Sequence, residues 1–405
     1  MYIPKYLCFT ANQANSAVGL VQKNSTAYLK YSTDKENWTE FNTGNVITLT
    51  NAGDKVYFKG SSSAGSSSDY TRFNMSGSIA VSGDIMTILC GDKETTELPH
   101  DYCCYKMFYE CGNHLISAPE LPATTLTKYC YDYMFYKCYG LITPPELPAM
   151  ILTDCCYDSM FYSCYRMTSA PRLPSTNLAP WCYAEMFSGC NGITTPPELP
   201  ATTLADGCYY GMLAQTYITR APELPATVLA KSCYSDMFNY CSHLTAAPSI
   251  LPATTLAPSC YYQMFAYTDL RVAPELPAET LASYCYYRMF QNCSNMTAMP
   301  VLPATTLAEY CYSFMVSNTG VSQLPELPVI DIPEKAYYGM FYSCWNIKLS
   351  TTQTGEYQTP YRIPAEGTTQ ADKYNVAMEM FNDTGGTFKG TPDVNTTYYT
   401  SNAVV

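Results

Sequence analysis

Residues 120–145 read ELPATTLTKYCYDYMFYKCYGLITPP, and close copies of this stretch follow one another through most of the chain. The dipeptide Met-Phe, or a close variant of it, recurs at Met107, Met134, Met160, Met186, Met212, Met237, Met264, Met289, Met315 and Met340. In the nine copies after the first, a Leu-Pro pair begins 13 residues before the methionine. All variation in length lies between one methionine and the next Leu-Pro. One part of each repeat is therefore rigid and the return connection tolerates insertion, which is typical of solenoid repeats.

Each repeat contains apolar residues at steps of four. In the quoted copy these residues are Leu126, Cys130, Met134 and Cys138, with Tyr131 and Phe135 one step further on. This spacing predicts one apolar face of an α-helix, and Thr124 or Thr125 is the predicted N-cap. The run Leu141-Ile142-Thr143, stopped by Pro144, predicts a strand of three or four residues. The expected fold is an α/β repeat solenoid of the leucine-rich-repeat type, with one short parallel strand and one helix per 26-residue repeat.

Three regions are predicted along the chain. Residues 1–95 are expected to form a small all-β domain, with one hairpin joining residues 29–31 to 38–41 and a second joining 46–49 to 55–59. Residues 96–350 hold ten leucine-rich-type repeats. Residues 351–405 are expected to form a degenerate last repeat and a C-terminal cap, because a terminal repeat has a neighbour on one side only.

Charge and hydropathy exclude two classes of partner. The 405 residues carry a net charge of −12, and charged residues are only 14% of the chain. Such a surface repels phosphates, so no nucleic-acid partner is expected. The sequence lacks a run of 18 apolar residues, so no membrane insertion is expected. The first residues also lack the features of a secretory signal, so either the protein is not exported by that route or a signal has been removed.

The twenty cysteines follow the repeat. One set lies four residues before the methionine and another lies four after it, so two cysteines of one helix would be about 12 Å apart, too far for a disulfide. Thr216, Thr268 and Thr319 replace the second cysteine in three repeats. A metal or redox centre would not survive that exchange. The cysteines are therefore predicted to be free, buried core residues, with no metal and no cofactor, and zinc or disulfide use is the alternative.

Carboxylates and histidines are weak candidates for catalysis. Glutamates share the position before Leu-Pro at Glu120, Glu146, Glu198, Glu223, Glu275 and Glu326. Stacked carboxylates could bind cations or hydrolyse glycosides, but other repeats interrupt the row with Arg172, Ser249 and Val301, which favours a solvated edge. No histidine lies near a nucleophile motif. No enzymatic activity and no catalytic residue are predicted.

Tyrosine is the residue type that points to binding. The tyrosines three residues before the methionine recur in nine repeats, which indicates packing in the core. Other positions exchange Tyr with Ser, Asp, Asn, Gln, Ala, Lys and Gly, so they are expected to face solvent. Tyrosine among such residues is the chemistry of adaptable recognition surfaces. The predicted recognition surface comprises Tyr133, Tyr136, Tyr162, Tyr210, Tyr240, Tyr262, Tyr267, Tyr287, Tyr338 and Tyr342. The alternative is a solvated face that merely contains many tyrosines.

The recurring motif, in forms such as ELPATTLAxxCYxxMFxxC, together with the predicted β hairpins, resembles the BspA-like leucine-rich repeat proteins of Bacteroidetes and of their crAss-like or related phages. The resemblance covers nearly the whole chain. It departs from the family pattern at Pro99, which takes the usual leucine position of the first repeat, and in the repeats that carry threonine.

What this resemblance implies is a surface-binding role without catalytic residues. The expected function is that of a non-enzymatic virion protein, a phage fibre, tail or capsid appendage, which recognises a host-surface glycan or protein. The alternatives are a bacterial cell-surface adhesin and, less favoured, a polysaccharide-degrading enzyme. Residues 1–95 are expected to dock to other virion proteins, and a homo-oligomer is left open.

Overall fold

The computed structural model describes residues 5–23, 25, 27–61, 65–322, 325, 327, 329, 332–347, 379–380 and 383–384. The chain divides into two compact units, which are described separately. The first unit comprises residues 1–200 with 215–217, and the second comprises 201–214 with 218–405. The predicted last repeat and cap, residues 351–405, lie outside the described residues except for two short pairs. Among the described residues, no helix has the length and apolar character needed to cross a membrane.

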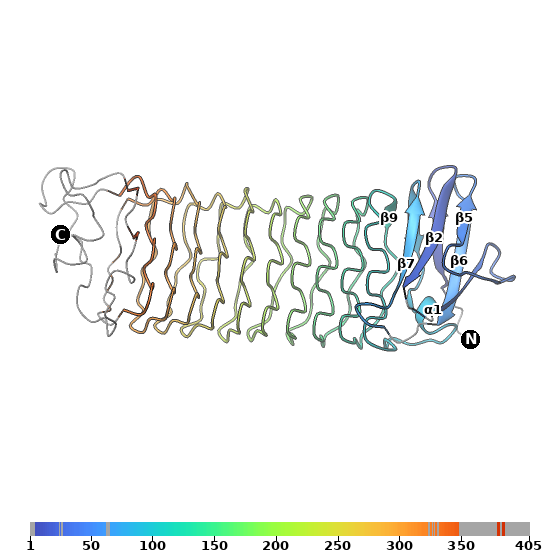
Figure 1. The fold of residues 1–405 in the computed structure, drawn as a ribbon, viewed down its shortest axis with the longest axis horizontal. Coiled ribbons are helices and arrows are strands. Elements are labelled where there is room, and N and C mark those ends of the chain that lie inside the picture. Colours follow the sequence, from blue (N-terminus) through green and yellow to red (C-terminus); the bar gives the residue numbers. More distant parts are fainter. Residues whose placement is uncertain are drawn as a thin grey trace, which may run out of the picture. The chain divides into compact units, whose positions relative to one another are not determined.

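The regular secondary structure is mostly sheet, with very little helix (Figure 1). The strands are β1 (Leu7–Ala11), β2 (Ser16–Lys23), β3 (Tyr28–Ser32), β4 (Thr39–Glu40), β5 (Val46–Leu49), β6 (Lys55–Ser61), β7 (Tyr70–Ser76), β8 (Ile79–Ser82) and β9 (Leu115–Ser117). They form a six-stranded sheet in the order β4-β3-β6-β1-β8-β9 and a three-stranded sheet in the order β5-β2-β7. One short helix, α1 (Met86–Leu89), follows β8. The predicted β character of the N-terminal region is confirmed.

The N-terminal sheets share an aromatic core. Alternate residues of β2, such as Val18 and Leu20, are buried, which is the period of two expected for a strand with one covered face. The ring of Phe73 on β7 lies 4.9 Å from that of Phe9 on β1 and 5.3 Å from that of Phe58 on β6, measured between centroids. Burial of these rings therefore holds the two sheets together.

One predicted hairpin is correct and the other is wrong. β3 pairs antiparallel with β4, as predicted. β5 pairs with β2, however, and β6 pairs with β1 and β3, so β5 and β6 belong to different sheets. The turn between them exists, since the amide of Asp54 donates to the carbonyl of Asn51. It is a corner from one sheet to the other, and turn residues alone do not distinguish a corner from a hairpin.

The first repeat joins the N-terminal sheets directly. β9 lies in this repeat and pairs in parallel with β8. The amide of Phe73 donates to the carbonyl of Met107, and the Phe73 ring stacks on that of Phe108 at 5.8 Å. The strands thus cover the first repeat within the first unit.

The prediction of one helix per repeat is wrong. The segments from the first cysteine to the second are consecutive turns, and Figure 1 draws no helical ribbon in them. In the quoted repeat, Tyr129, Tyr133 and Lys137 have φ angles of 56°, 56° and 54°. A left-handed residue at every fourth position interrupts a right-handed helix. The predicted strand at residues 141–143 is also absent, and β9 is the only named strand within the described repeats.

Backbone hydrogen bonds alternate between two directions along each turn segment. The amides of Tyr131, Tyr133 and Phe135 donate to the carbonyls of Cys156, Asp158 and Met160 in the following repeat. The residues between them donate to the residue three positions back, as Met134 does to Tyr131. The same alternation recurs within each unit, for example from Tyr234 to Cys260 and from Met237 to Tyr234 in the second unit. Successive repeats within a unit are thus bonded to each other along the turn segment, which satisfies the buried amides without helix or ladder.

Buried ladders of identical side chains form the core of the repeats. The tyrosines three residues before the methionine are buried, as predicted, and neighbours such as Tyr131 and Tyr157 stack at 5.7 Å. Phenylalanines after the methionine form a second ladder, with Phe135 and Phe161 5.5 Å apart. All twenty cysteines are thiols, and all except Cys90 and Cys155 are buried.

The second cysteine has a role beyond filling space. Its Sγ donates to a carbonyl of the preceding repeat, as Cys164 does to Phe135 at 3.1 Å. Thr268, which replaces this cysteine, donates through its Oγ1 to the carbonyl of Phe265 in its own repeat at 2.9 Å. Cysteine and threonine thus exchange at this position because both are small hydrogen-bond donors.

Candidate binding surface

Positions in a repeat are counted here from its methionine, so position −2 lies two residues before it. Left-handed backbone occurs at positions −5, −1 and +3, as at Tyr129, Tyr133 and Lys137. The alternating residues that were predicted to face solvent occupy positions −2, −1, +2 and +3. None of the ten predicted tyrosines at these positions is buried, and Tyr240 and Tyr267 are the most exposed, at 52% and 36%.

The ten tyrosines do not form one set. Three of them, Tyr133, Tyr136 and Tyr162, lie in the first unit, and the other seven lie in the second. Within each unit the structure brings particular tyrosines together, because one position recurs in successive hydrogen-bonded repeats.

In the first unit, position +2 carries a continuous stack. The ring of Tyr136 lies 5.0 Å from that of Tyr109 and 4.8 Å from that of Tyr162, with interplanar angles of 7° and 17°. Tyr133 leans against Tyr136 at 5.2 Å. Burial, followed by the charges of Asp158 and Asp132, raises the pKa of Tyr133 to about 12. The Tyr133 phenol is therefore a neutral hydrogen-bonding group at physiological pH.

In the second unit, the tyrosines form pairs. Tyr240 and Tyr267 stack at 4.2 Å, and burial together with a hydrogen bond to Tyr267 raises the pKa of Tyr240. Tyr262 and Tyr287 stack at 4.9 Å. Tyr338 and Tyr342 contact the ring of Phe314, at 4.8 and 6.1 Å.

Stacking decides what these rings can offer to a ligand. Tyr136 lies between two parallel rings, so it presents mainly its edge and hydroxyl. The stack in the first unit ends beside Ser188, which occupies position +2 after Tyr162. A ring face can meet a ligand only at the end of a stack or on the outer side of a pair, and elsewhere hydrogen bonding is the main contact.

Cations beside the rings were missed by the sequence analysis. The Lys106 Nζ lies 4.8, 5.1 and 5.4 Å from the ring centroids of Tyr105, Tyr109 and Tyr133. The Lys137 Nζ lies 5.1 Å from that of Tyr136. Both lysines occupy the alternating positions −1 and +3, so the same pattern that identified the tyrosines could have identified them. Arg72 on β7 lies 6.0 Å from the Tyr109 ring, which no repeat pattern could predict.

Two aspartates occupy position −2 in successive repeats of the first unit. Asp132 is buried, and its Oδ1 has no hydrogen-bond partner among the described residues. Burial, followed by repulsion from Asp158, raises the pKa of Asp132 to about 9. Burial also raises the pKa of Asp158 to about 7, against the opposing hydrogen bond from Ser159. Asp132 is thus an uncharged acid at neutral pH.

Other exposed aromatic side chains also lie outside the predicted set. Tyr165 is 43% exposed and stacks on Tyr139 at 4.8 Å, one residue after the second cysteine of each repeat. Trp345 takes the same position in the second unit and is 63% exposed. This position, +5, was not among the alternating positions that the sequence analysis considered.

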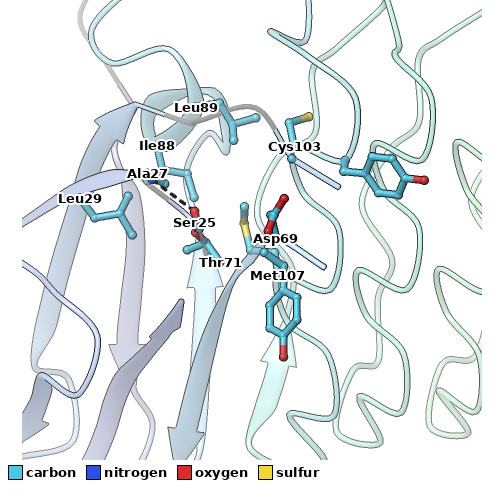
Figure 2. A pocket seen from close by; sticks show the side chains of 12 residues that line it. Ser25, Ala27, Leu29, Asp69, Thr71, Ile88, Leu89, Cys103 and Met107 are labelled. Carbon is cyan, nitrogen blue, oxygen red and sulfur yellow. Dashed lines mark hydrogen bonds between the residues drawn. The ribbon is translucent and has the colours of Figure 1, made fainter. Parts of the chain in front are cut away.

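Enclosed space is limited in the parts of the chain that the structure describes. A small cavity between β7, α1 and the first repeat is lined by residues that include Thr71, Ile88, Cys103 and Met107 (Figure 2). Its volume of about 20 Å³ holds little more than one water molecule. A shallow groove of about 390 Å³ crosses the three-stranded sheet over Gly19. Its walls include Val46 and Asn74, and it contains no charged side chain.

The described members of the glutamate row, Glu120, Glu146, Glu198, Glu223 and Glu275, are exposed, and Glu326 lies outside the described residues. No group of three or more His, Cys, Asp or Glu residues with metal-binding geometry occurs among the described residues.

Comparisons with protein-family models, with curated proteins and with solved structures give no match for this chain.

Proposed function

We propose that this chain is a non-enzymatic binding protein whose repeats present tyrosines to an extended glycan or to a protein surface. The observation that carries the proposal is the recurrence of accessible tyrosine groups at alternating positions over a buried, invariant core. The pair Tyr240–Tyr267 is the most exposed of these groups.

The backbone suits such a surface. Each repeat donates several amides to the next, and the tyrosine and phenylalanine ladders fix the register. We infer from this bonding that the repeats of each unit belong to the solenoid class, built from turns and not from the helices of leucine-rich repeats. A rigid scaffold with exchangeable surface residues loses little conformational entropy on binding.

Tyrosine hydroxyls and ring edges define the ligand chemistry. Extended glycans and polar protein surfaces both offer many hydroxyl and carbonyl partners at short intervals. Individual contacts would be weak, and several along one ligand would combine into useful affinity.

The proposed setting is a virion, where the chain would serve as a fibre, tail or capsid appendage that contacts the host surface. Residues 1–95 are the proposed attachment to other virion proteins. The resemblance of the repeats to BspA-like proteins supports this setting and equally supports the alternative of a bacterial surface adhesin. Immunodetection of the chain in purified virus particles would support the virion setting, whereas its absence from them would support the bacterial adhesin.

The binding proposal is tested by replacing Tyr240 and Tyr267 together with Ser. Both side chains are exposed, so the fold should persist, and attachment of the purified chain to a glycan array or to host cells should weaken about tenfold, a loss of about 1.4 kcal/mol. The matched control is Trp345→Ser, which removes an exposed aromatic ring that is not one of the ten predicted tyrosines. Equal binding by the parent chain and the double variant would remove this pair from the proposed surface.

A further inference from the structure

We propose that the Tyr109–Tyr136 stack binds an anionic polysaccharide, with Arg72, Lys106 and Lys137 contacting its carboxylate or sulfate groups. This inference rests on the proposed function, because it names the ligand class for one part of the tyrosine surface.

Three separate segments bring their cations to the same two rings. Arg72 comes from β7, Lys106 from the first repeat and Lys137 from the second. The Tyr109 ring has the Arg72 guanidinium at 6.0 Å and the Lys106 ammonium at 5.1 Å. The Tyr136 ring, 5.0 Å away, has the Lys137 ammonium at 5.1 Å. Because residues 72, 106 and 137 are far apart in sequence, this convergence is a property of the folded first unit.

The local charge is positive although the chain carries −12 in total. The Glu110 carboxylate lies beside the stack, with its Oε1 3.7 Å from the Lys137 Nζ and a side-chain hydrogen bond to Tyr109. The Asp132 carboxyl faces Lys106 but is neutral at pH 7, because burial raises its pKa to about 9. Asp158 and Glu185 act on Tyr133, whose ring also contacts Tyr136 and Lys106. An anion at the Tyr109–Tyr136 stack therefore meets three cations, of which Lys137 is paired with Glu110.

The donors at this site retain unused capacity. A lysine ammonium that lies over aromatic rings still has three N–H donors for another acceptor. The Arg72 side chain is only half-buried, and its guanidinium has terminal N–H donors besides the buried Nε. Charge-assisted hydrogen bonds to carboxylate or sulfate oxygens are the strong type of hydrogen bond, and the tyrosine hydroxyls add contacts to neighbouring sugar hydroxyls. Rings and cations together thus recognise a sugar polymer that also carries negative charge.

Tyr240 and Tyr267 provide an internal comparison. Both are stacked and exposed, and no cation–ring contact involves them among the described residues. In the second unit, the Tyr262–Tyr287 pair has one guanidinium, that of Arg288, 5.0 Å from the Tyr287 ring. The proposed anion site is placed on the first unit because three cations meet at its stack.

The test measures binding of the full chain to four polymers: dextran, dextran sulfate, polygalacturonate and polyglutamate. Dextran and dextran sulfate share a backbone, polygalacturonate supplies carboxylates, and polyglutamate supplies charge without sugar. We expect the tightest binding to dextran sulfate, to polygalacturonate or to both. The polymer that binds identifies sulfate or carboxylate as the recognised group. The double variant Arg72→Gln, Lys106→Gln should lower that affinity about tenfold or more.

The matched control is Arg220→Gln with Lys231→Gln, which removes two exposed cations elsewhere and should change affinity less than about twofold. Lys137→Gln is a single, milder variant for the case in which the double variant does not fold. If dextran binds as tightly as its sulfate, or if polyglutamate competes equally, this inference fails while the proposed function can stand. If the parent chain binds no polysaccharide and Tyr240→Ser with Tyr267→Ser changes no attachment, both fail.

Discussion

The N-terminal strands and the repeats both have an aromatic core, but they differ in backbone conformation. Both bury aromatic rings, Phe9, Phe58 and Phe73 in the sheets and the Phe135–Phe161 ladder in the repeats. In the sheets, side chains alternate with a period of two, and each ring meets rings from several strands. In the repeats, the orientation recurs every four residues, and each ring meets its own counterpart in the neighbouring repeat. The sheet core is therefore a cluster, and the repeat core is a column.

The largest expected effect distinguishes the clustered core of the sheets from the columnar core of the repeats. Phe58→Ala and Phe161→Ala each remove a buried ring, and each should lower the free energy of unfolding by about 3–5 kcal/mol in denaturant titration. The two variants should differ in how far the increase in amide hydrogen exchange extends from the replaced ring. Phe58 contacts Phe9, Phe41 and Phe73, so exchange should rise throughout the N-terminal strands. After Phe161→Ala, it should rise mainly in the adjoining repeats. Uniform exchange after both changes would contradict the distinction.

The second expected effect concerns pH, and its sign differs between the two regions. In the β3–β4 turn, amide hydrogen bonds from Asn37 and Glu36 lower the pKa of exposed Asp34. In the repeats, the pKa of buried Asp132 is raised from 3.8 to about 9. A raised carboxyl pKa means that the folded state binds its proton more tightly, so stability falls as pH rises from about 4 toward 9.

Between pH 5 and pH 7, Asp132 stays protonated in the folded state but is ionised in the unfolded state, so the free energy of unfolding should fall by roughly 2–3 kcal/mol, since each pH unit corresponds to about 1.4 kcal/mol. Asp132→Asn cannot ionise and should flatten the pH profile of unfolding, with its stabilising effect largest at the higher pH. Asp34→Asn should instead reduce stability only above the ordinary aspartate pKa. A parent chain that is more stable at pH 7 than at pH 5 would refute the assignment for Asp132.

The smallest expected effect tests the backbone of the repeats. Gln263 has a φ of 50°, whereas Gln291, three positions further into its own repeat, is not left-handed. Glycine adopts positive φ without strain, so Gln263→Gly should leave the unfolding free energy unchanged or raise it by up to about 1 kcal/mol. The same replacement at Gln291 should lower it by about 1 kcal/mol. Thermal unfolding of both variants measures the difference, and equal losses would indicate that position −1 is not left-handed in solution.

The sequence predicted the repeat length, the buried residues and the β character of the N-terminal region, because these follow from spacing and apolar pattern. It failed on the backbone between the cysteines. An α-helix turns about 100° per residue, so steps of four drift by about 40° each, and strict steps of four fit a four-residue turn better. Gly189, Gly211 and Gly339 also fall inside the predicted helices, where glycine is unfavourable and where the structure has positive φ. The strict steps of four and the glycines were both present in the sequence, but the segment was predicted to be a helix.

The candidate site was predictable only in part. Positions at which Tyr alternates with Ser or Asp between repeats identified the tyrosines that reach solvent, because such positions are not expected in the core. It could not show that Tyr109, Tyr136 and Tyr162 cover one another, because stacking depends on the register between repeats. The contact of Arg72 with Tyr109 depends on how β7 covers the first repeat, which no local pattern encodes.

Within the turn segments, the hydrogen bonds between repeats run from an amide of the earlier repeat to a carbonyl of the later one, as from Tyr131 to Cys156. Outside these segments the direction is reversed, as from Thr124 to Thr96 and from Gly140 to Gly112. In the first unit, the amide of Phe73 on β7 donates to the carbonyl of Met107, so the strand supplies the donor that a preceding repeat would otherwise have given. The N-terminal strands therefore end the turn segments with a partner of matching polarity, as a terminal cap of a repeat array must.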